Sequence, residues 1–289
     1  MSICVHIDGK VRDPSGAMVS VFDRGFLFGD SVYETVAWVC GRLVFLSEHL
    51  DRLDRSARRL FMDTPARDAI VRAVRETVAA TGEAEARVRI IVTRGVGPVD
   101  IDPATAGSPQ LVVIAQPLGA PTAEMLASGI AVEVVHLSRG GPGNPDPAIK
   151  SGNYLNSVLA MAEARRRRAG AGEAILCSGS GSIAEGATSN VFFVQAGILA
   201  TPSLEVGILD GVTRSKVLGL AKAQGIPVRE PAFVAPRELL AADEVFLTSA
   251  VRGVLPVTRV DGSSVGTGKP GPLTLRLLDL YRRLISEDS

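Results

Sequence analysis

A lysine between a run of chain-breaking residues and a helical repeat places the strongest constraint on how this sequence folds. Residues 140–147 contain three glycines and three prolines, which interrupt regular structure. Lys150 follows, and apolar residues then recur at helical spacing at Leu155, Val158, Leu159 and Ala162. The pattern predicts a lysine at the start of a packed helix, where partial desolvation makes an amine a usable nucleophile. From position alone, a solvated lysine is the commoner interpretation.

The composition is that of a globular chain without a nucleic-acid surface. Its 289 residues can bury one large core or two modest ones, and 46% are hydrophobic against 21% charged. The formal net charge is zero, so nothing argues for a nucleic-acid partner. The basic run Arg165–Arg168 ends the helix after Lys150, where a solvated positive face also suits the helix dipole.

Neither metal binding nor membrane insertion is indicated. Cys4, Cys40 and Cys177 are widely spaced and the three histidines are scattered, so we expect no metal site. The odd number of cysteines and the absence of a signal peptide favour the cytoplasm. No apolar run reaches the roughly 18 residues of a membrane-spanning helix.

Helical and strand patterns are mixed along the chain without strict alternation. Strands are predicted near residues 5–11, 32–39, 88–93, 111–115, 130–135, 173–177, 191–194, 198–201, 227–230 and 244–248. Helices are predicted near residues 47–60, with Ser47 as the cap, and near 68–81, 155–168, 212–224 and 273–285. This mixture predicts an α+β fold with two domains. We expect a small N-terminal domain over 1–118, a linker over 119–128 and a large domain over 129–289.

Four motifs occur in a fixed order. They are Gly29-Asp-Ser-Val-Tyr-Glu34, Lys150-Ser-Gly-Asn-Tyr-Leu-Asn-Ser157, Ile183-Ala-Glu-Gly-Ala-Thr-Ser-Asn190 and Leu209-Asp-Gly-Val-Thr-Arg214. Together they resemble the class IV, fold type IV, pyridoxal-phosphate enzymes. That family includes branched-chain aminotransferases, D-amino acid aminotransferases, R-selective amine transaminases and aminodeoxychorismate lyase. The resemblance covers residues from about 7 to about 257 and implies a homodimer of two-domain chains. It also implies a small N-terminal α/β domain and a larger C-terminal, pyridoxal-phosphate-binding domain with a barrel-like sheet.

Pyridoxal phosphate needs an amine, a charge partner for its pyridine nitrogen, a phosphate site and packing on its ring. The resemblance implies that Lys150 forms the Schiff base and moves the proton at the substrate Cα. It also implies that Glu185 faces the pyridine nitrogen and that Arg52 binds the phosphate. The remaining cofactor residues that it implies are Tyr154, Leu209, Val212, Thr213 and Ser249. Without the resemblance, Arg52 reads as a surface charge and Glu185 as a turn residue.

The substrate pocket is the least specific part of the resemblance. The implied substrate-binding residues are Tyr33, Thr35, Arg89, Ala250 and Arg252. The Arg-x-His trap of D-amino acid enzymes is absent, because Val99-Asp-Ile101 stands in its place. Arg87-Val-Arg89 keeps only the arginine of the Tyr-x-Arg of branched-chain enzymes. The segments Arg94-Gly-Val-Gly97 and Ile101-Asp-Pro103 look branched-chain-like.

Three hypotheses remain open at this point. The favoured one is a transaminase that moves an amino group to a 2-oxo acid. Its donor is either an amino acid of the branched-chain kind or an amine. The second is aminodeoxychorismate lyase, in which the same lysine eliminates pyruvate and 4-aminobenzoate is formed. Thr35, next to the substrate side of the Gly29–Glu34 motif, is consistent with this lyase. The third is a non-catalytic binding protein on the same fold. The sequence leaves the stereochemistry of the substrate undecided, because one scaffold serves both L- and D-specific members.

Overall fold

The computed structural model describes residues 3–138 and 146–287, and most of the glycine- and proline-rich run lies outside them. The chain forms two compact units. The first unit comprises the chain up to Gly119 together with Ile149–Asn153, and the second comprises Ala120–Ala148 and the chain from Tyr154 onward. The five residues around Lys150 therefore belong with the N-terminal unit, although they are far from it in sequence.

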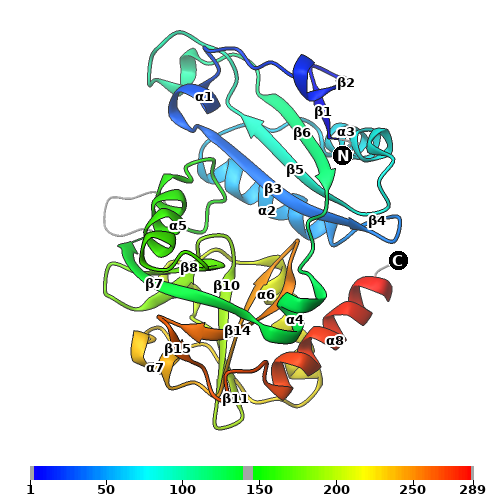
Figure 1. The fold of residues 1–289 in the computed structure, drawn as a ribbon. Coiled ribbons are helices and arrows are strands. Elements are labelled where there is room, and N and C mark those ends of the chain that lie inside the picture. The colour runs from blue at the N-terminus through cyan, green and yellow to red at the C-terminus, as the bar shows by residue number, and fades with distance from the viewer. Residues whose placement is uncertain (1–2, 139–145, 288–289) are drawn as a thin grey trace. The chain divides into compact units, whose positions relative to one another are not determined.

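An antiparallel sheet of six strands forms the first unit, in the order β2-β1-β6-β5-β3-β4 (Figure 1). The strands are β1 (Cys4–Ile7), β2 (Lys10–Arg12), β3 (Ser31–Val39), β4 (Arg42–Leu43), β5 (Ala86–Thr93) and β6 (Gln110–Pro117). The helices are α1 (Arg24–Phe28), α2 (Leu46–Arg59) and α3 (Arg67–Thr81). The apolar stripes of α2 and α3 pack on one face of the sheet, with Leu53 and Val74 fully buried against Val36 and Val88.

The predicted helices and strands of this unit are confirmed, with one correction at the start of α2. Asp8 and Gly9 both have positive φ, as the turn of a two-residue hairpin requires. Ser47, predicted as the cap of α2, lies inside the helix. The capping residue is Phe45, whose φ is 51° and whose side chain makes no capping hydrogen bond. Phe45 is buried, so its apolar packing fixes the entry of the chain into α2.

A mixed sheet of nine strands forms the second unit, in the order β12-β11-β10-β13-β14-β7-β8-β9 with β15 beside β14. The strands are β7 (Ile130–Ser138), β8 (Glu173–Cys177), β9 (Ile183–Gly186), β10 (Asn190–Gln195), β11 (Ile198–Ala200), β12 (Val228–Arg229), β13 (Glu244–Ser249), β14 (Gly253–Val260) and β15 (Ser263–Ser264). Its helices are α4 (Ala123–Ser128), α5 (Leu155–Arg167), α6 (Val212–Ala223), α7 (Pro236–Leu240) and α8 (Pro272–Glu287). The sheet curls into a half-barrel, because β9 contacts β10 although other strands separate them in the sheet order.

Three strands of this unit, β9, β14 and β15, lie outside the predicted elements. Gly253 and Pro256 argue against a strand at β14, because both residues are unfavourable inside strands. Proline is tolerated only where no neighbouring strand needs a hydrogen bond from its backbone nitrogen. The parallel neighbour β7 pairs with β14 only from Val257 onward, which leaves Pro256 without a partner on that side. Short α4 lies within the segment predicted as a linker, and the hydroxyl of Thr122 caps it by accepting from Met125 N at 3.1 Å.

The helix after Lys150 packs with a different face from the predicted one. Leu155, Val158 and Leu159 were predicted as the packed stripe, but their exposed fractions are 68%, 59% and 47%. The buried face of α5 consists of Ser157, Ala160 and Ala164, whose small side chains let the helix approach β7 and β8 closely. The prediction was wrong because helical spacing shows that a stripe exists but not which side of the helix meets the sheet.

Candidate active site

Lys150 is held along an edge of the first unit's sheet rather than at a helix start. Its backbone oxygen accepts a hydrogen bond from Tyr33 N at 3.0 Å, and its N–H donates to the hydroxyl of Ser56 on α2 at 3.1 Å. Ser151 forms a bridge with Val32, and Gly152 N donates to Ser31 O at 2.9 Å. The backbone of the lysine is thus fixed between β3 and α2 from both sides.

Two cationic side chains meet the ring of Tyr33. The Nζ atom of Lys150 lies 4.7 Å from the ring centroid, and the Cζ atom of Arg89 lies 3.9 Å from it. Thr35 is directly opposite Arg89 in the pairing of β3 with β5, and it shares a sheet face with Tyr33 because side chains alternate along a strand. The structure therefore brings together four of the predicted residues, Tyr33, Thr35, Arg89 and Lys150.

A buried ionic network lies on the helix-facing side of the same strand. Glu34 is fully buried, and its two carboxylate oxygens accept from Arg52 Nε at 2.7 Å and Arg52 Nη2 at 2.8 Å. His49 Nδ1 lies 2.7 Å from Glu34 Oε2. Burial alone would raise the pKa of Glu34, but the charge of Arg52 and the hydrogen bonds from Arg52 and His49 outweigh it. They hold the pKa of Glu34 far below its ordinary value of 4.5.

Glu34 and His49 are partners that the sequence did not identify. The alternation Val32, Glu34, Val36 places the glutamate on the buried face of β3, and this was an available signal. Arg52 lies one helical turn beyond His49 on α2, so both reach the same carboxylate. Arg52 is therefore a buried, oriented guanidinium and not the surface charge of the alternative interpretation.

In the second unit, Glu185 is a buried carboxylate within a small polar group. It accepts from Leu209 N at 3.1 Å and from the amide of Asn190 at 3.3 Å. The same amide donates to Leu209 O at 3.0 Å, so Asn190 links the carboxylate to the segment before α6. Asn190 ends the motif of residues 183–190, and that motif alone does not indicate its place opposite Thr248 across β10 and β13.

The segment Leu209–Gly211 leads into α6, whose N-terminus carries no side-chain cap. Val212 and Thr213 begin the helix and are both buried. A Cβ atom on Gly211 would lie 2.0 Å from Asn190 Oδ1, so only glycine permits this approach of the backbone. The first N–H groups of a helix have no intrahelical partner and attract anions.

Arg252 is tied to a buried carboxylate. Its Nη2 donates to Glu173 and, at 2.8 Å, to the hydroxyl of Thr188. Glu173 is 1% exposed, so its charge lies next to the guanidinium with little water between. The hydroxyl of Ser249 accepts from Arg252 N and Nε, both at 3.4 Å. Glu173 and Thr188 were missed, because no local motif links them to a residue more than sixty positions later.

The predicted residues divide between the two units. Those of the first unit are Tyr33, Thr35, Arg52, Arg89 and Lys150. Those of the second unit are Tyr154, Glu185, Leu209, Val212, Thr213, Ser249, Ala250 and Arg252. Tyr154 is the residue immediately before α5.

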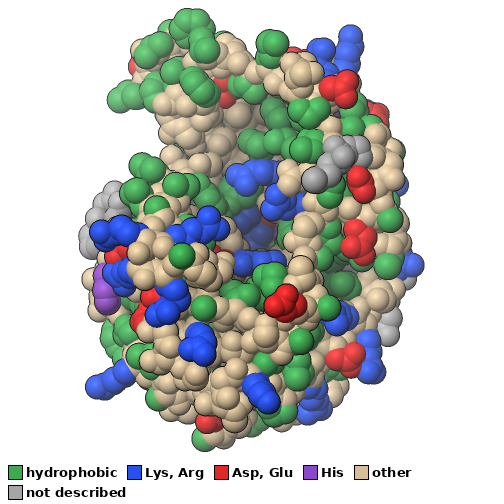
Figure 2. Space-filling view, viewed as in Figure 1, with side chains coloured by type: hydrophobic (Ala, Val, Ile, Leu, Met, Phe, Trp, Pro, Cys, Tyr) green, Lys and Arg blue, Asp and Glu red, His purple; other side chains and the backbone are tan. Residues whose placement is uncertain are grey.

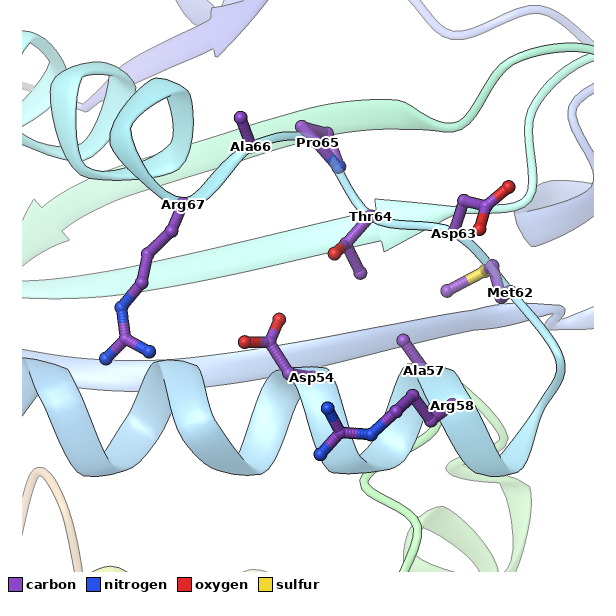
Figure 3. Close-up of a pocket in the computed structure, with 9 residues that line it drawn as sticks. All are labelled: Asp54, Ala57, Arg58, Met62, Asp63, Thr64, Pro65, Ala66 and Arg67. Carbon is purple, nitrogen blue, oxygen red and sulfur yellow. The ribbon is translucent and has the colours of Figure 1, made fainter.

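A separate pocket of about 350 Å³ lies in the first unit between α2 and the segment before α3 (Figure 3). Asp54 and Arg58 reach it from the helix, and Asp63 and Arg67 from the opposite side. None of the predicted site residues lines it. Over residues 3–138 and 146–287, no group of three or more acidic, histidine or cysteine side chains could hold a metal ion. No helix within these ranges is long and apolar enough to cross a membrane.

Comparison with known proteins gives consistent matches over nearly the full chain. The model of the amino-transferase class IV family matches residues 31–260. A putative branched-chain-amino-acid aminotransferase of Methanocaldococcus jannaschii is 37% identical over 96% of this chain and 95% of the relative. A D-alanine aminotransferase of Bacillus licheniformis is 35% identical over 93% of each.

Solved structures agree with these relatives. The branched-chain amino acid aminotransferase of Escherichia coli superposes with a TM-score of 0.92 at 32% identity, covering 99% of this chain and 95% of that one. The branched-chain amino acid aminotransferase of Thermobaculum terrenum, solved in its pyridoxal-phosphate form, superposes with a TM-score of 0.84 at 26% identity, covering 98% and 93%. The predicted fold type is confirmed.

Proposed function

Because the chain belongs to the class IV aminotransferases, which are pyridoxal-phosphate-dependent transaminases, we propose that Lys150 is the residue that binds the cofactor covalently. The observation that carries this proposal is the double anchoring of its backbone to β3 and α2, together with the position of Nζ 4.7 Å from the centroid of the Tyr33 ring. Neither the lyase nor the binding-protein alternative is favoured, since the curated relatives are named aminotransferases.

Lys150 then has two tasks in the reaction. When bound, pyridoxal phosphate supplies a ring that accepts the electron pair released at the substrate Cα. With the cofactor bound, the Nζ atom of Lys150 would take the proton from that Cα and deliver it to the C4′ atom of the cofactor. The backbone hydrogen bonds of Lys150 limit how far its amine can reach, and the Nζ atom lies 4.7 Å from the centroid of the Tyr33 ring.

The polar group around Glu185 fits the pyridine nitrogen of the cofactor. Its buried carboxylate accepts hydrogen bonds from Leu209 N and Asn190, which restrict its orientation. A carboxylate beside the pyridine nitrogen holds a proton on that atom, which strengthens the electron demand of the ring. Leu209 offers an apolar surface for the ring, and Tyr154 is the proposed hydrogen-bond partner of the cofactor hydroxyl.

The uncapped start of α6 in the second unit and the guanidinium of Arg52 in the first unit each have the chemistry of a phosphate ligand. Val212 N and Thr213 N supply donors at the positive end of the helix dipole. Arg52 adds a positive charge whose orientation Glu34 fixes through two hydrogen bonds. We propose both as phosphate ligands on the strength of this chemistry.

For the substrates, we propose a branched-chain or similarly apolar amino acid as donor and a 2-oxo acid as acceptor. Relatives named as branched-chain aminotransferases support the donor class. Arg89, held against Tyr33, is a cation suited to the second carboxylate of glutamate or its 2-oxo acid. Thr35, which lies opposite Arg89 in the first unit, is also proposed as a substrate-binding residue. Ala250 and Arg252 are the substrate-binding residues proposed for the second unit.

The test of Lys150 is chemical. Purified protein with pyridoxal phosphate is reduced with borohydride, digested and analysed by mass spectrometry. We expect the phosphopyridoxyl mass on the peptide containing Lys150, no adduct in Lys150→Ala, and an unchanged adduct in Lys222→Ala, an exposed lysine on α6. An adduct on another lysine, or none in the wild type, would refute the assignment.

The test of the donor is a half-reaction with single substrates. L-Leucine, L-valine, D-alanine and R-1-phenylethylamine are mixed separately with the loaded protein, and the visible cofactor band is followed. We expect the two branched-chain L-amino acids to bleach the band and D-alanine to leave it. Bleaching by D-alanine alone would overturn the proposed donor class and leave transamination standing.

We also propose that two copies of the chain form a homodimer, because each unit exposes an apolar surface. In the first unit, Val21, Phe22 and Phe26 are 62%, 50% and 69% exposed, and hydrophobic side chains gather over α1 at the upper left of Figure 2. In the second, Leu155 and Val158 form the outer face of α5. Exposed patches of this kind mark association surfaces. Sedimentation should give twice the chain mass of 30.3 kDa, and Phe26→Asp should reduce it to one chain.

A further inference from the structure

A buried threonine hydroxyl in the second unit has no hydrogen-bond partner. Thr248 is 2% exposed, and its Oγ1 atom contacts neither a donor nor an acceptor in the described part of the chain. Other buried threonines are satisfied: Thr201 donates to Val191 O at 2.8 Å and Thr274 to Glu244 at 2.7 Å. An unpaired buried hydroxyl is costly, so its presence in a native protein calls for an explanation.

The strand register shows which way this hydroxyl faces. Thr248 lies directly opposite Asn190 in the antiparallel pair β13–β10, so both side chains leave the same face of the sheet. Two residues further along, Phe246 and Phe192 stack on that face with centroids 4.9 Å apart, which confirms the alternation. Thr248 therefore belongs to the face that carries Asn190.

The start of α6 covers the same end of this face. Asn190 donates to Leu209 O, and its Oδ1 lies 2.0 Å from the position of a Cβ on Gly211. Helix α6 also contacts β13. The uncapped N–H groups of Val212 and Thr213 and the unpaired hydroxyl of Thr248 thus lie around one end of one strand pair.

We propose that Thr248 donates its hydroxyl proton to the phosphate of the bound cofactor, in place of the Ser249 hydroxyl that the sequence singles out. A phosphate offers several strong acceptor oxygens, enough for two backbone donors and a hydroxyl at once. Ser249 leaves the opposite face by strand alternation, and its hydroxyl already accepts from Arg252. Ala250, the first residue after β13, has no hydroxyl. The inference rests on the proposed function, since it concerns the same cofactor.

The experiment measures binding to the apoenzyme of pyridoxal phosphate and of pyridoxal, which lacks the phosphate. The variants are Thr248→Val, which keeps the shape of the side chain, Thr248→Ser, which keeps the hydroxyl, and Ser249→Ala. For Thr248→Val we expect the Kd of pyridoxal phosphate to rise on the order of tenfold or more, as for a lost hydrogen bond to a charged group. The Kd of pyridoxal should not change, and Thr248→Ser should stay within about threefold of wild type for both ligands.

The stability of the apoenzyme supplies a second readout. Thr248→Val removes a hydroxyl that has no partner, so the denaturation midpoint of the apoenzyme should stay the same or rise. A purely structural role of the hydroxyl would lower it. The proposal is overturned if Thr248→Val leaves the affinity for pyridoxal phosphate unchanged, if it weakens both ligands equally, or if only Ser249→Ala weakens pyridoxal phosphate. A wild-type protein that forms no reducible adduct at Lys150 would instead refute the proposed function itself.

Discussion

The buried network of Glu34, Arg52 and His49 allows a sharp test of how the first unit is stabilised. The side chains of Glu34 and Arg52 are 0% and 6% exposed, and three short polar contacts converge on one carboxylate. The substitution Glu34→Gln keeps the shape but removes the charge. It also replaces one acceptor oxygen by an amide that donates, so a donor of Arg52 or the ring of His49 then faces another donor.

The expected loss follows from that geometry. Removing one partner of a buried ion pair leaves the other charge buried and uncompensated, which costs about 3–5 kcal/mol of unfolding free energy. Burying either charge alone costs free energy. The expected loss therefore measures the cost of leaving Arg52 unpaired, and it is not the net stabilisation that the ion pair provides. The double substitution Glu34→Gln with Arg52→Met should therefore recover part of the loss, because no buried charge remains on Arg52.

Trp38 provides the assay, because it is the only tryptophan of the chain and lies on β3 with Glu34. Urea unfolding of the apoenzyme is followed by its fluorescence, which reports on the first unit. The matched control is Asp51→Asn, which breaks the exposed pair between Asp51 and Arg67 and should cost less than about 1 kcal/mol. A Glu34→Gln variant that loses no more than this control would refute the reasoning.

Three further outcomes are expected from the same structure. Since the pKa of Glu34 in the folded protein lies far below 4.5, its contribution is complete above that pH and is lost as the pH falls further; unfolding midpoints of wild type and Glu34→Gln should converge in acid. Gly211→Ala would place a methyl group 2.0 Å from Asn190 Oδ1 and should lower the unfolding free energy by about 1–3 kcal/mol. The control is Gly219→Ala, in open space within α6, which should stabilise the protein slightly; equal effects of the two substitutions would contradict the contact. Gly95→Ala, at φ +99° with a backbone oxygen 2.1 Å away, should cost more than about 2 kcal/mol in thermal unfolding, and a neutral result would argue against this loop conformation.

Much of the fold was predictable because its signals are local. Period-two runs mark β3, β5 and β6, and amphipathic spacing marks α2, α3 and α8. The motifs around Lys150 and Glu185 were recognisable for the same reason, since each is a short, contiguous string. The strand β14 was not predicted because it contains Pro256. This proline is tolerated because β7 pairs with β14 only from Val257 onward, which the sequence does not show.

The sequence by itself determined most of the element types, the family and the residues able to carry the chemistry. Only the tertiary structure decided what those residues touch. Lys150 donates its backbone N–H to Ser56, 94 positions earlier, so the lysine belongs to the edge of β3 and not to the helix that follows it. The packed face of α5 was likewise decided by close approach to a sheet, which favours alanine and serine over leucine. Only the pairing of Thr248 with Asn190 shows that the two side chains lie on the same face of the sheet. Local patterns report the periodicity of one segment, whereas contacts between distant segments depend on shape and hydrogen bonding that appear once the chain has folded.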